Sequence, residues 1–392
     1  MNQSKILYLI LVNVLVPSSF INCISSRNDI HELQAFKSDK SAFIFLISYT
    51  ATSTIPGLTV AGANPDLIKY TPPADAEYIH YGECKSVRVI PATPDGKPTP
   101  AIITKTALDI SSIPIYVVDS GSEIKPKLPY VSINSPAGKN ILDEPGLDYH
   151  KTVENYEMGK MLGKQMSKVN DTIILGESVP GGTTTALGVM QAMGVNAFNK
   201  VGSSMPDNPH LLKNKLIELA LVRSGLKTGD CSNDPFKAIS NLGDPMMPTA
   251  AGIADGVISN GKKVILAGGT QMCCIVKIMK SLDIDLKHNV CLGTTSYLYN
   301  DEKSDLIGLL DQIDQDVAVF HIDLALHKST KMGLRAYAEG FVKEGAGAGG
   351  TAIATFLNNE DLTQDYFLKN LEDNYLRTIE EPRPISLNKK SE

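Results

Sequence analysis

A glutamate precedes a run of glycines and threonines in the segment 175–186. The order is a short apolar run, Glu177, the pair Gly181 and Gly182, and then three hydroxyl residues that open an apolar stretch: Thr183, Thr184 and Thr185. Glycines let a backbone approach an anion closely, and the free N–H groups of a helix N-terminus then hold it. The segment therefore predicts a phosphate-binding turn beside a carboxylate. A plain strand-to-helix turn with a threonine cap would show the same pattern.

A second glycine-rich run also carries a glutamate. Glu344 precedes Gly345 and Gly347, and the apolar stretch Ile353–Leu357 that follows predicts a helix. A carboxyl group removed from water has a raised pKa and can act as a general base near neutral pH. The alternative is a solvated glutamate ahead of a helix that packs closely through its glycines.

A third turn of this kind contains Gly268, Gly269 and Thr270, again after an apolar run. Because open α/β sheets bind ligands at the carboxyl ends of their strands, several glycine turns at strand ends predict one shared cleft. No lysine follows Gly182, which disfavours an ATP-hydrolysing Walker loop. The GxGxxG fingerprint of a dinucleotide-dependent oxidoreductase is also missing after the first strand.

Short apolar, β-branched runs predict the strands that would position these turns. They lie at residues 42–48, 87–90, 115–121, 172–176, 264–269 and 317–320. Stretches with apolar residues at helical spacing alternate with them, at 158–166, 211–222 and 274–282. Strands that are apolar throughout are buried on both faces. We therefore predict a doubly wound, mostly parallel α/β sheet flanked by helices (Rossmann-like), with a small additional helical portion.

Three regions are predicted along the chain. Residues 1–40 form an N-terminal extension outside the fold, residues 41–371 form the α/β domain, and residues 372–392 form a charged tail. The apolar run from Ile6 to Val16 is similar to the core of a signal peptide and is too short to span a bilayer of about 30 Å. A non-folding N-terminal extension, for which an over-long start is one origin, is the preferred interpretation of this segment, and export is the alternative.

Composition excludes several classes of partner. The net charge is −6, tryptophan is absent, and no run of Lys or Arg offers a surface for nucleic acid. The six cysteines show neither CxxC pairs nor histidines at ligand spacing, so we expect no metal site. Cysteines without a disulfide framework suit a reducing cytoplasm. We expect a cytoplasmic protein that binds a small molecule and neither membrane nor nucleic acid.

In this order, the segments resemble the nicotinate-nucleotide–dimethylbenzimidazole phosphoribosyltransferase family of cobalamin synthesis. The resemblance is strongest to a divergent branch found in archaea and cyanobacteria, and it covers roughly residues 40 to 380. The branch motifs lie at 55–57, 61–65, 70–77 and 177–185. Residues 177–184 and 343–348 are similar to two motifs of the characterised enzymes. Lys343 stands where those enzymes have glycine, and Phe341 where they commonly have arginine.

The resemblance implies a function and a site. Glu344 falls on the family's catalytic base and Glu177 on its second active-site glutamate, while the glycine–threonine turns would bind the 5′-phosphate. The reaction would move the 5-phosphoribosyl group of nicotinate mononucleotide to an azole or purine base, without a cofactor. Characterised members form dimers, which suggests a homodimer. The alternative is a non-catalytic protein that binds a nucleotide or cobamide precursor.

Overall fold

Eight strands of the described residues form one sheet in the order β1-β8-β7-β6-β5-β2-β3-β4. The computed structural model describes residues 20–23, 30–62, 64–88, 90–93 and 96–381. The strands are β1 (Ile21–Cys23), β2 (Ser41–Ile47), β3 (Ile115–Asp119), β4 (Val131–Ser132), β5 (Thr172–Ser178), β6 (Lys263–Ala267), β7 (Val290–Thr295) and β8 (Ala318–Ile322). All neighbouring pairs are parallel except β1 and β8. The predicted mostly parallel sheet is confirmed.

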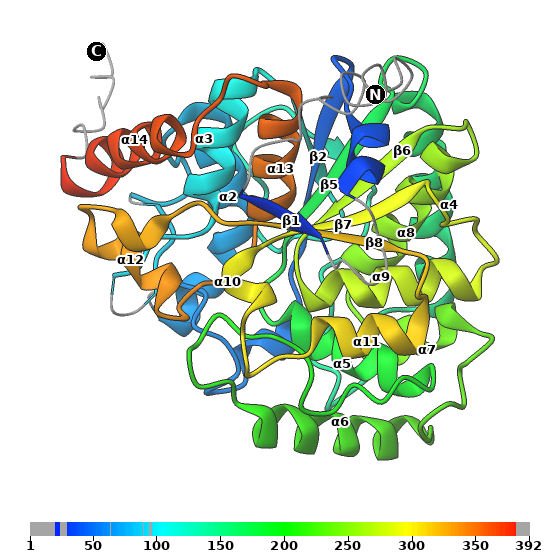
Figure 1. Cartoon of the computed structure of the whole chain (residues 1–392). Helices are drawn as coiled ribbons and strands as arrows, with labels where there is room; N and C mark the ends of the chain where they lie inside the picture. The colour runs from blue at the N-terminus through cyan, green and yellow to red at the C-terminus, as the bar shows by residue number, and fades with distance from the viewer. Residues whose placement is uncertain (1–19, 24–29, 63, 89, 94–95, 382–392) are drawn as a thin grey trace, which may run out of the picture.

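Helices cover both faces of the sheet (Figure 1). One face packs against α2 (Thr71–Tyr81), α3 (Ala101–Ser111), α12 (Met332–Ala338), α13 (Ala348–Asn358) and α14 (Gln364–Tyr375). The other packs against α4 (Tyr149–Met166), α5 (Gly182–Ala192), α6 (His210–Ser224), α7 (Pro235–Leu242), α8 (Met246–Ile258), α9 (Thr270–Ser281) and α11 (Leu306–Ile313). The short helix α10 (Ser296–Tyr299) follows β7 directly. Two hydrophobic cores therefore lie on opposite faces of the sheet.

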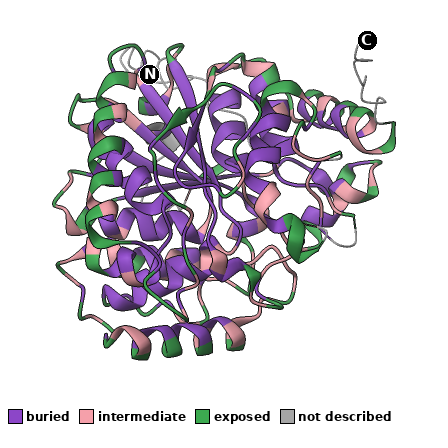
Figure 2. Ribbon diagram, turned by 180° about the vertical axis from the view of Figure 1, so that it is seen from behind, coloured by how far each residue is buried: buried purple, intermediate pink, exposed green. Residues whose placement is uncertain are grey.

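The central strand β5 shows why these runs are apolar throughout. Ile173 and Leu175 belong to one core, and Ile174 between them belongs to the other. Side chains of a strand alternate between faces, so a sheet covered on both sides needs apolar residues at consecutive positions. Figure 2 shows the resulting buried sheet, with most exposed residues on the outer surfaces of the helices and in the loops. Exceptions in the sheet include the edge strand β4 and Tyr116 of β3, which are exposed.

Glycines bring the last of the covering helices close to the sheet. Gly347 has a φ of 77° just before α13, a backbone conformation that other residues rarely adopt. A Cβ on Gly176 of β5 would come within 2.9 Å of the Gly347 Cα. The backbone of β5 and the start of α13 are therefore in direct contact, which places residue 344 beside the sheet.

The predicted boundaries of the domain are wrong at both ends. Within the predicted extension 1–40, β1 pairs with β8, and the 3₁₀ helix Ile30–Phe36 buries Leu33 and Phe36. At the other end α14 continues to Tyr375, and a π-helical turn follows over Leu376–Glu380. Apolar side chains in both segments find partners that are distant in sequence. The predictions for residues 1–19 and 382–392 lie outside the described residues.

Two further details differ from the sequence-based prediction. The strand predicted at 87–90 does not form, and its described residues belong to an irregular segment before Pro91. Pro91 then joins a short turn in which Ala92 bridges Pro98. Strand β7 was missed because its sequence, VCLGTT, has only three apolar residues. Across the described part of the chain, no helix combines the length and apolarity needed to cross a membrane.

Candidate active site

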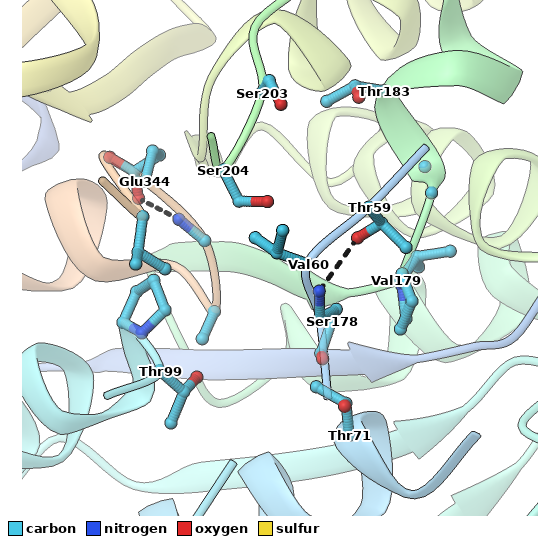
Figure 3. A pocket seen from close by; sticks show the side chains of 18 of the residues that line it. Thr59, Val60, Thr71, Thr99, Ser178, Val179, Thr183, Ser203, Ser204 and Glu344 are labelled. Atoms are coloured by element: carbon cyan, nitrogen blue, oxygen red, sulfur yellow. Dashed lines mark hydrogen bonds between the residues drawn. The ribbon is translucent and has the colours of Figure 1, made fainter. Parts of the chain in front are cut away.

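A pocket opens where β5 and β6 end, at the edge of the sheet where the N-termini of α5 and α9 also lie (Figure 3). Its walls come from segments that are far apart in the sequence: residues 58–62, the first turns of α2, residues 91–93 and 97–100, residues 202–204 and residues 342–346. This is the edge at which parallel α/β sheets bind ligands. Sequence-distant loops therefore meet in one place.

Most of the residues predicted from the three glycine runs line this pocket. They are Glu177, Gly181, Gly182, Thr183, Gly269, Thr270, Glu344 and Gly345. Four others lie behind its surface: Thr184, Thr185, Gly268 and Gly347. Thr185 donates to Asp244 Oδ2 at 2.6 Å, and Gly347 supports the entry into α13. The structure thus brings the two predicted glutamates into one cavity, whereas these four residues shape its walls.

Glu344 is fixed by four hydrogen bonds. Its Oε2 accepts from the Thr294 hydroxyl at 3.0 Å and the Thr295 N–H at 2.8 Å. Its Oε1 accepts from the N–H groups of Gly345 at 3.1 Å and Gly349 at 3.2 Å. The carboxylate therefore sits at the N-terminus of α13, where a negative charge is favourable. Loss of solvent raises the pKa of Glu344, and these hydrogen bonds oppose that rise.

Glu177 has a different environment. Its side chain is 8% exposed, and burial, followed by the charges of Asp244, Glu344 and Asp75, raises its pKa to about 8. A hydrogen bond from the backbone of Val179 opposes this rise. Without a ligand, Glu177 is therefore mostly protonated at neutral pH. A positively charged ligand beside it would favour the ionised form.

Asp75 is a third carboxyl group in the pocket, and sequence reasoning did not single it out. It is buried on α2, where it accepts hydrogen bonds from Thr99 Oγ1 and Ser178 Oγ, each at 2.8 Å. Burial raises its pKa to about 7. The available signal was one acidic residue within the otherwise apolar and proline-rich start of α2, in the sequence TPPADA.

Buried cations lie behind the opposite wall of the pocket. Lys213 donates to Thr183 Oγ1 at 3.2 Å and to the Gly202 carbonyl at 2.6 Å. Burial and the charge of Lys343 lower the pKa of Lys213 to about 7. Lys343 itself is paired with Asp301 at 2.9 Å. Two amino groups and one carboxylate are thus buried beside Thr183 and the 202–204 loop, and Lys213 is protonated in only part of the molecules at neutral pH.

Gln271 completes this wall. It is buried, and its Nε2 has no hydrogen-bond partner among the described residues. A Cβ on Gly182 would lie 2.5 Å from that nitrogen, so the free amide rests against the N-terminus of α5. No group of three or more His, Cys, Asp or Glu side chains in the described ranges is arranged to hold a metal ion.

Comparisons with known proteins agree with this architecture. A family model described as phosphoribosyltransferase matches residues 107–297. A UPF0284 protein of Archaeoglobus fulgidus is 46% identical to this chain, and the match covers 87% of this chain and 94% of the relative. A UPF0284 protein of Methanothermobacter thermautotrophicus is 40% identical, and the match covers 81% of this chain and 88% of the relative. The crystal structure of CobT from Thermus thermophilus superposes with a TM-score of 0.55 at 14% identity, covering 85% of this chain and 84% of that one.

A second Thermus thermophilus structure, of nicotinate-nucleotide–dimethylbenzimidazole phosphoribosyltransferase, gives a TM-score of 0.56 at 14% identity, over 88% and 86% of the two chains. At this identity the likeness concerns the fold. The relation to the archaeal relatives is much closer and spans nearly their whole length. This chain belongs to the UPF0284 family, and its fold is similar to that of CobT.

Proposed function

We propose that the protein transfers the 5-phosphoribosyl group of nicotinate mononucleotide to an azole or purine base, the step that activates the lower ligand of a cobamide. One observation carries the proposal. Three carboxyl groups, those of Asp75, Glu177 and Glu344, line the pocket, and none forms an ion pair with a described lysine or arginine. A buried carboxylate without a cation is costly unless the ligand brings the positive charge.

The end of the pocket near Thr183 suits a phosphate. The N-termini of α5 and α9 both reach it, whereas the N-terminus of α13 already holds Glu344. Helix N-termini bind anions through their free N–H groups and their dipole. The unpartnered Gln271 amide and the buried Lys213 amino group offer N–H donors at the same wall, and a bound phosphate would favour the protonated form of Lys213. We therefore assign the 5′-phosphate to this end of the pocket.

The carboxyl groups suit the chemistry at C1′. Nicotinate mononucleotide carries a pyridinium on C1′, and the bond to its nitrogen breaks with the electron pair moving to that nitrogen. A ring nitrogen of the acceptor base forms the new bond to C1′, and its N–H proton must leave. Glu344 is assigned to accept this proton, and Glu177 to stabilise the positive charge that develops at C1′.

Donor and acceptor are both small molecules, so the test is direct. Purified protein is incubated with nicotinate mononucleotide and a panel of azoles and purines, and mass spectrometry is used to detect new ribotides. We expect a ribotide whose mass equals that of the acceptor base plus the phosphoribosyl group. Binding of nicotinate mononucleotide without any ribotide across the panel would instead favour a non-catalytic binding protein.

A further inference from the structure

Four polar residues form a cluster at one end of the pocket. Asp75 lies at its centre, with the hydroxyl groups of Thr99 and Ser178 donating to its two carboxyl oxygens. Thr71, one turn earlier on α2, also lines the pocket. Each oxygen of a carboxylate can accept two hydrogen bonds, so each Asp75 oxygen keeps one acceptor position.

The Asp75 cluster lies away from the proposed phosphate site. In Figure 3, Thr71 and Thr99 lie at the lower edge of the view and Thr183 and Ser203 at the upper edge, with Ser178 and Glu344 between them. If the phosphate is held near Thr183 and C1′ lies near Glu344, the space beside Asp75 receives a base. That base is either the departing nicotinate or the acceptor.

Charge decides between these two. Nicotinate carries its own carboxylate, and placing it beside Asp75 would set two acidic groups against each other. Lys97 also lines the pocket, but its ammonium group lies over the Phe341 ring, and no lysine charge lowers the pKa of Asp75. The acceptor base has no such charge. The walls beside the cluster contain Pro91, Ala92 and Pro100, small apolar side chains that suit the faces of a flat ring. The polar cluster would then meet the edge of that ring.

We propose that Asp75 determines the acceptor, and that it selects a base with an N–H donor on its six-membered ring, such as a 6-aminopurine, over an alkylated benzimidazole. The inference rests on the proposed transfer reaction. An exocyclic amino group of a purine donates to the free acceptor position of Asp75. Dimethylbenzimidazole presents methyl groups instead and leaves the buried carboxyl group without that partner. A site built around a hydrogen bond rejects an analogue that lacks it.

The test measures acceptor preference and begins with the unaltered protein. With nicotinate mononucleotide as the donor, kcat/KM is measured for adenine, for 6-methylpurine and for dimethylbenzimidazole. We expect adenine to be preferred over 6-methylpurine by about ten- to a hundredfold, the value of one hydrogen bond to a charged group. Equal kcat/KM values for these two purines would overturn the inference. Phosphoribosyl transfer to both purines would still support the proposed reaction.

Variants then assign the preference to Asp75. Asp75→Leu has the same branched shape and no polar atom, and we expect the ratio of kcat/KM for adenine to that for 6-methylpurine to fall to about one, whatever the absolute rates. Asp66→Asn is the control, because Asp66 is exposed and outside the pocket wall, and its preference should match the parent protein. An unchanged preference in a folded Asp75→Leu variant would contradict the assignment. If the unaltered protein forms no ribotide with any acceptor and releases no nicotinate, the proposed function itself is refuted.

Discussion

The chemistry proposed for Glu344 depends on one carboxylate that the surrounding backbone holds in place. Glu344→Gln keeps the shape but turns an amide N–H toward groups that already donate, and it removes the proton acceptor. We expect ribotide formation to fall by about 10²- to 10⁴-fold, the usual contribution of a general base. Binding of nicotinate mononucleotide should change much less.

Steady-state kinetics and calorimetry check this prediction. Glu339→Gln is a matched control, because Glu339 is exposed and lies outside the pocket. A Glu344→Gln protein that retains more than about a tenth of the parent rate would refute the assignment of Glu344 as the proton acceptor, since a general base contributes far more than that.

The raised pKa of Glu177 predicts a pH dependence of stability. In the unfolded chain this carboxyl group titrates near 4.5, and in the folded protein near 8. The folded state therefore holds a proton that the unfolded chain releases between these values, and the contribution of Glu177 to stability falls as pH rises through that window. Glu177→Gln, which does not titrate, should raise the Tm relative to the parent protein more at pH 8 than at pH 5. An equal difference at both pH values, measured by thermal unfolding, would contradict the raised pKa.

At the scale of single residues, sequence could identify only candidates that stand beside a recognisable motif. Glu177 and Glu344 each precede a glycine-rich turn, and both line the pocket. Asp75 was missed because its partners, Thr99 and Ser178, are 24 and 103 residues away along the chain. Lys213 was missed because a lysine on a helix is normally exposed. Only the packed structure shows that this lysine is buried behind Thr183.

The turn between β5 and α5 gives a prediction at the scale of elements. Gly182→Ala places a Cβ where the Gln271 amide now lies, 2.5 Å away, so Gln271 must move from the N-terminus of α5. We expect weaker binding of nicotinate mononucleotide, by roughly tenfold if one hydrogen bond to the phosphate is lost. Nicotinate riboside, which lacks the phosphate, should bind with nearly unchanged affinity. Calorimetry that shows the same loss for both ligands would contradict a phosphate site at this turn.

Elements could be predicted where periodicity and length gave a clear signal. Strands β2, β3, β5, β6 and β8 all contain apolar runs that the sequence identifies. The edge strands β1 and β4 have three and two residues, too few to show a period, and only their neighbours make them strands. The false strand at 87–90 contains three β-branched residues, but Pro91 ends the run, and the segment that begins at Pro91 lines the pocket wall.

At the scale of the whole molecule, the segment before β2 contributes to stability. Leu33 and Phe36 are buried in the core that α13 also joins, and β1 extends the sheet beside β8. A chain lacking residues 1–38 should therefore unfold at a clearly lower temperature than a chain lacking residues 1–19, which keeps every described contact. Leu33→Ala should cost about 2–5 kcal/mol of unfolding free energy, as for other buried leucines. Identical Tm values for the two truncated chains would contradict this role.

The central claim concerns the whole site acting on two substrates, and the stoichiometry of the reaction tests it most directly. Nicotinate and ribotide are quantified in the same reaction, with and without an acceptor base. The account predicts one nicotinate released for each ribotide formed, and no release when the acceptor is omitted. Release of nicotinate without an acceptor, or no release under any condition, would contradict phosphoribosyl transfer by this protein.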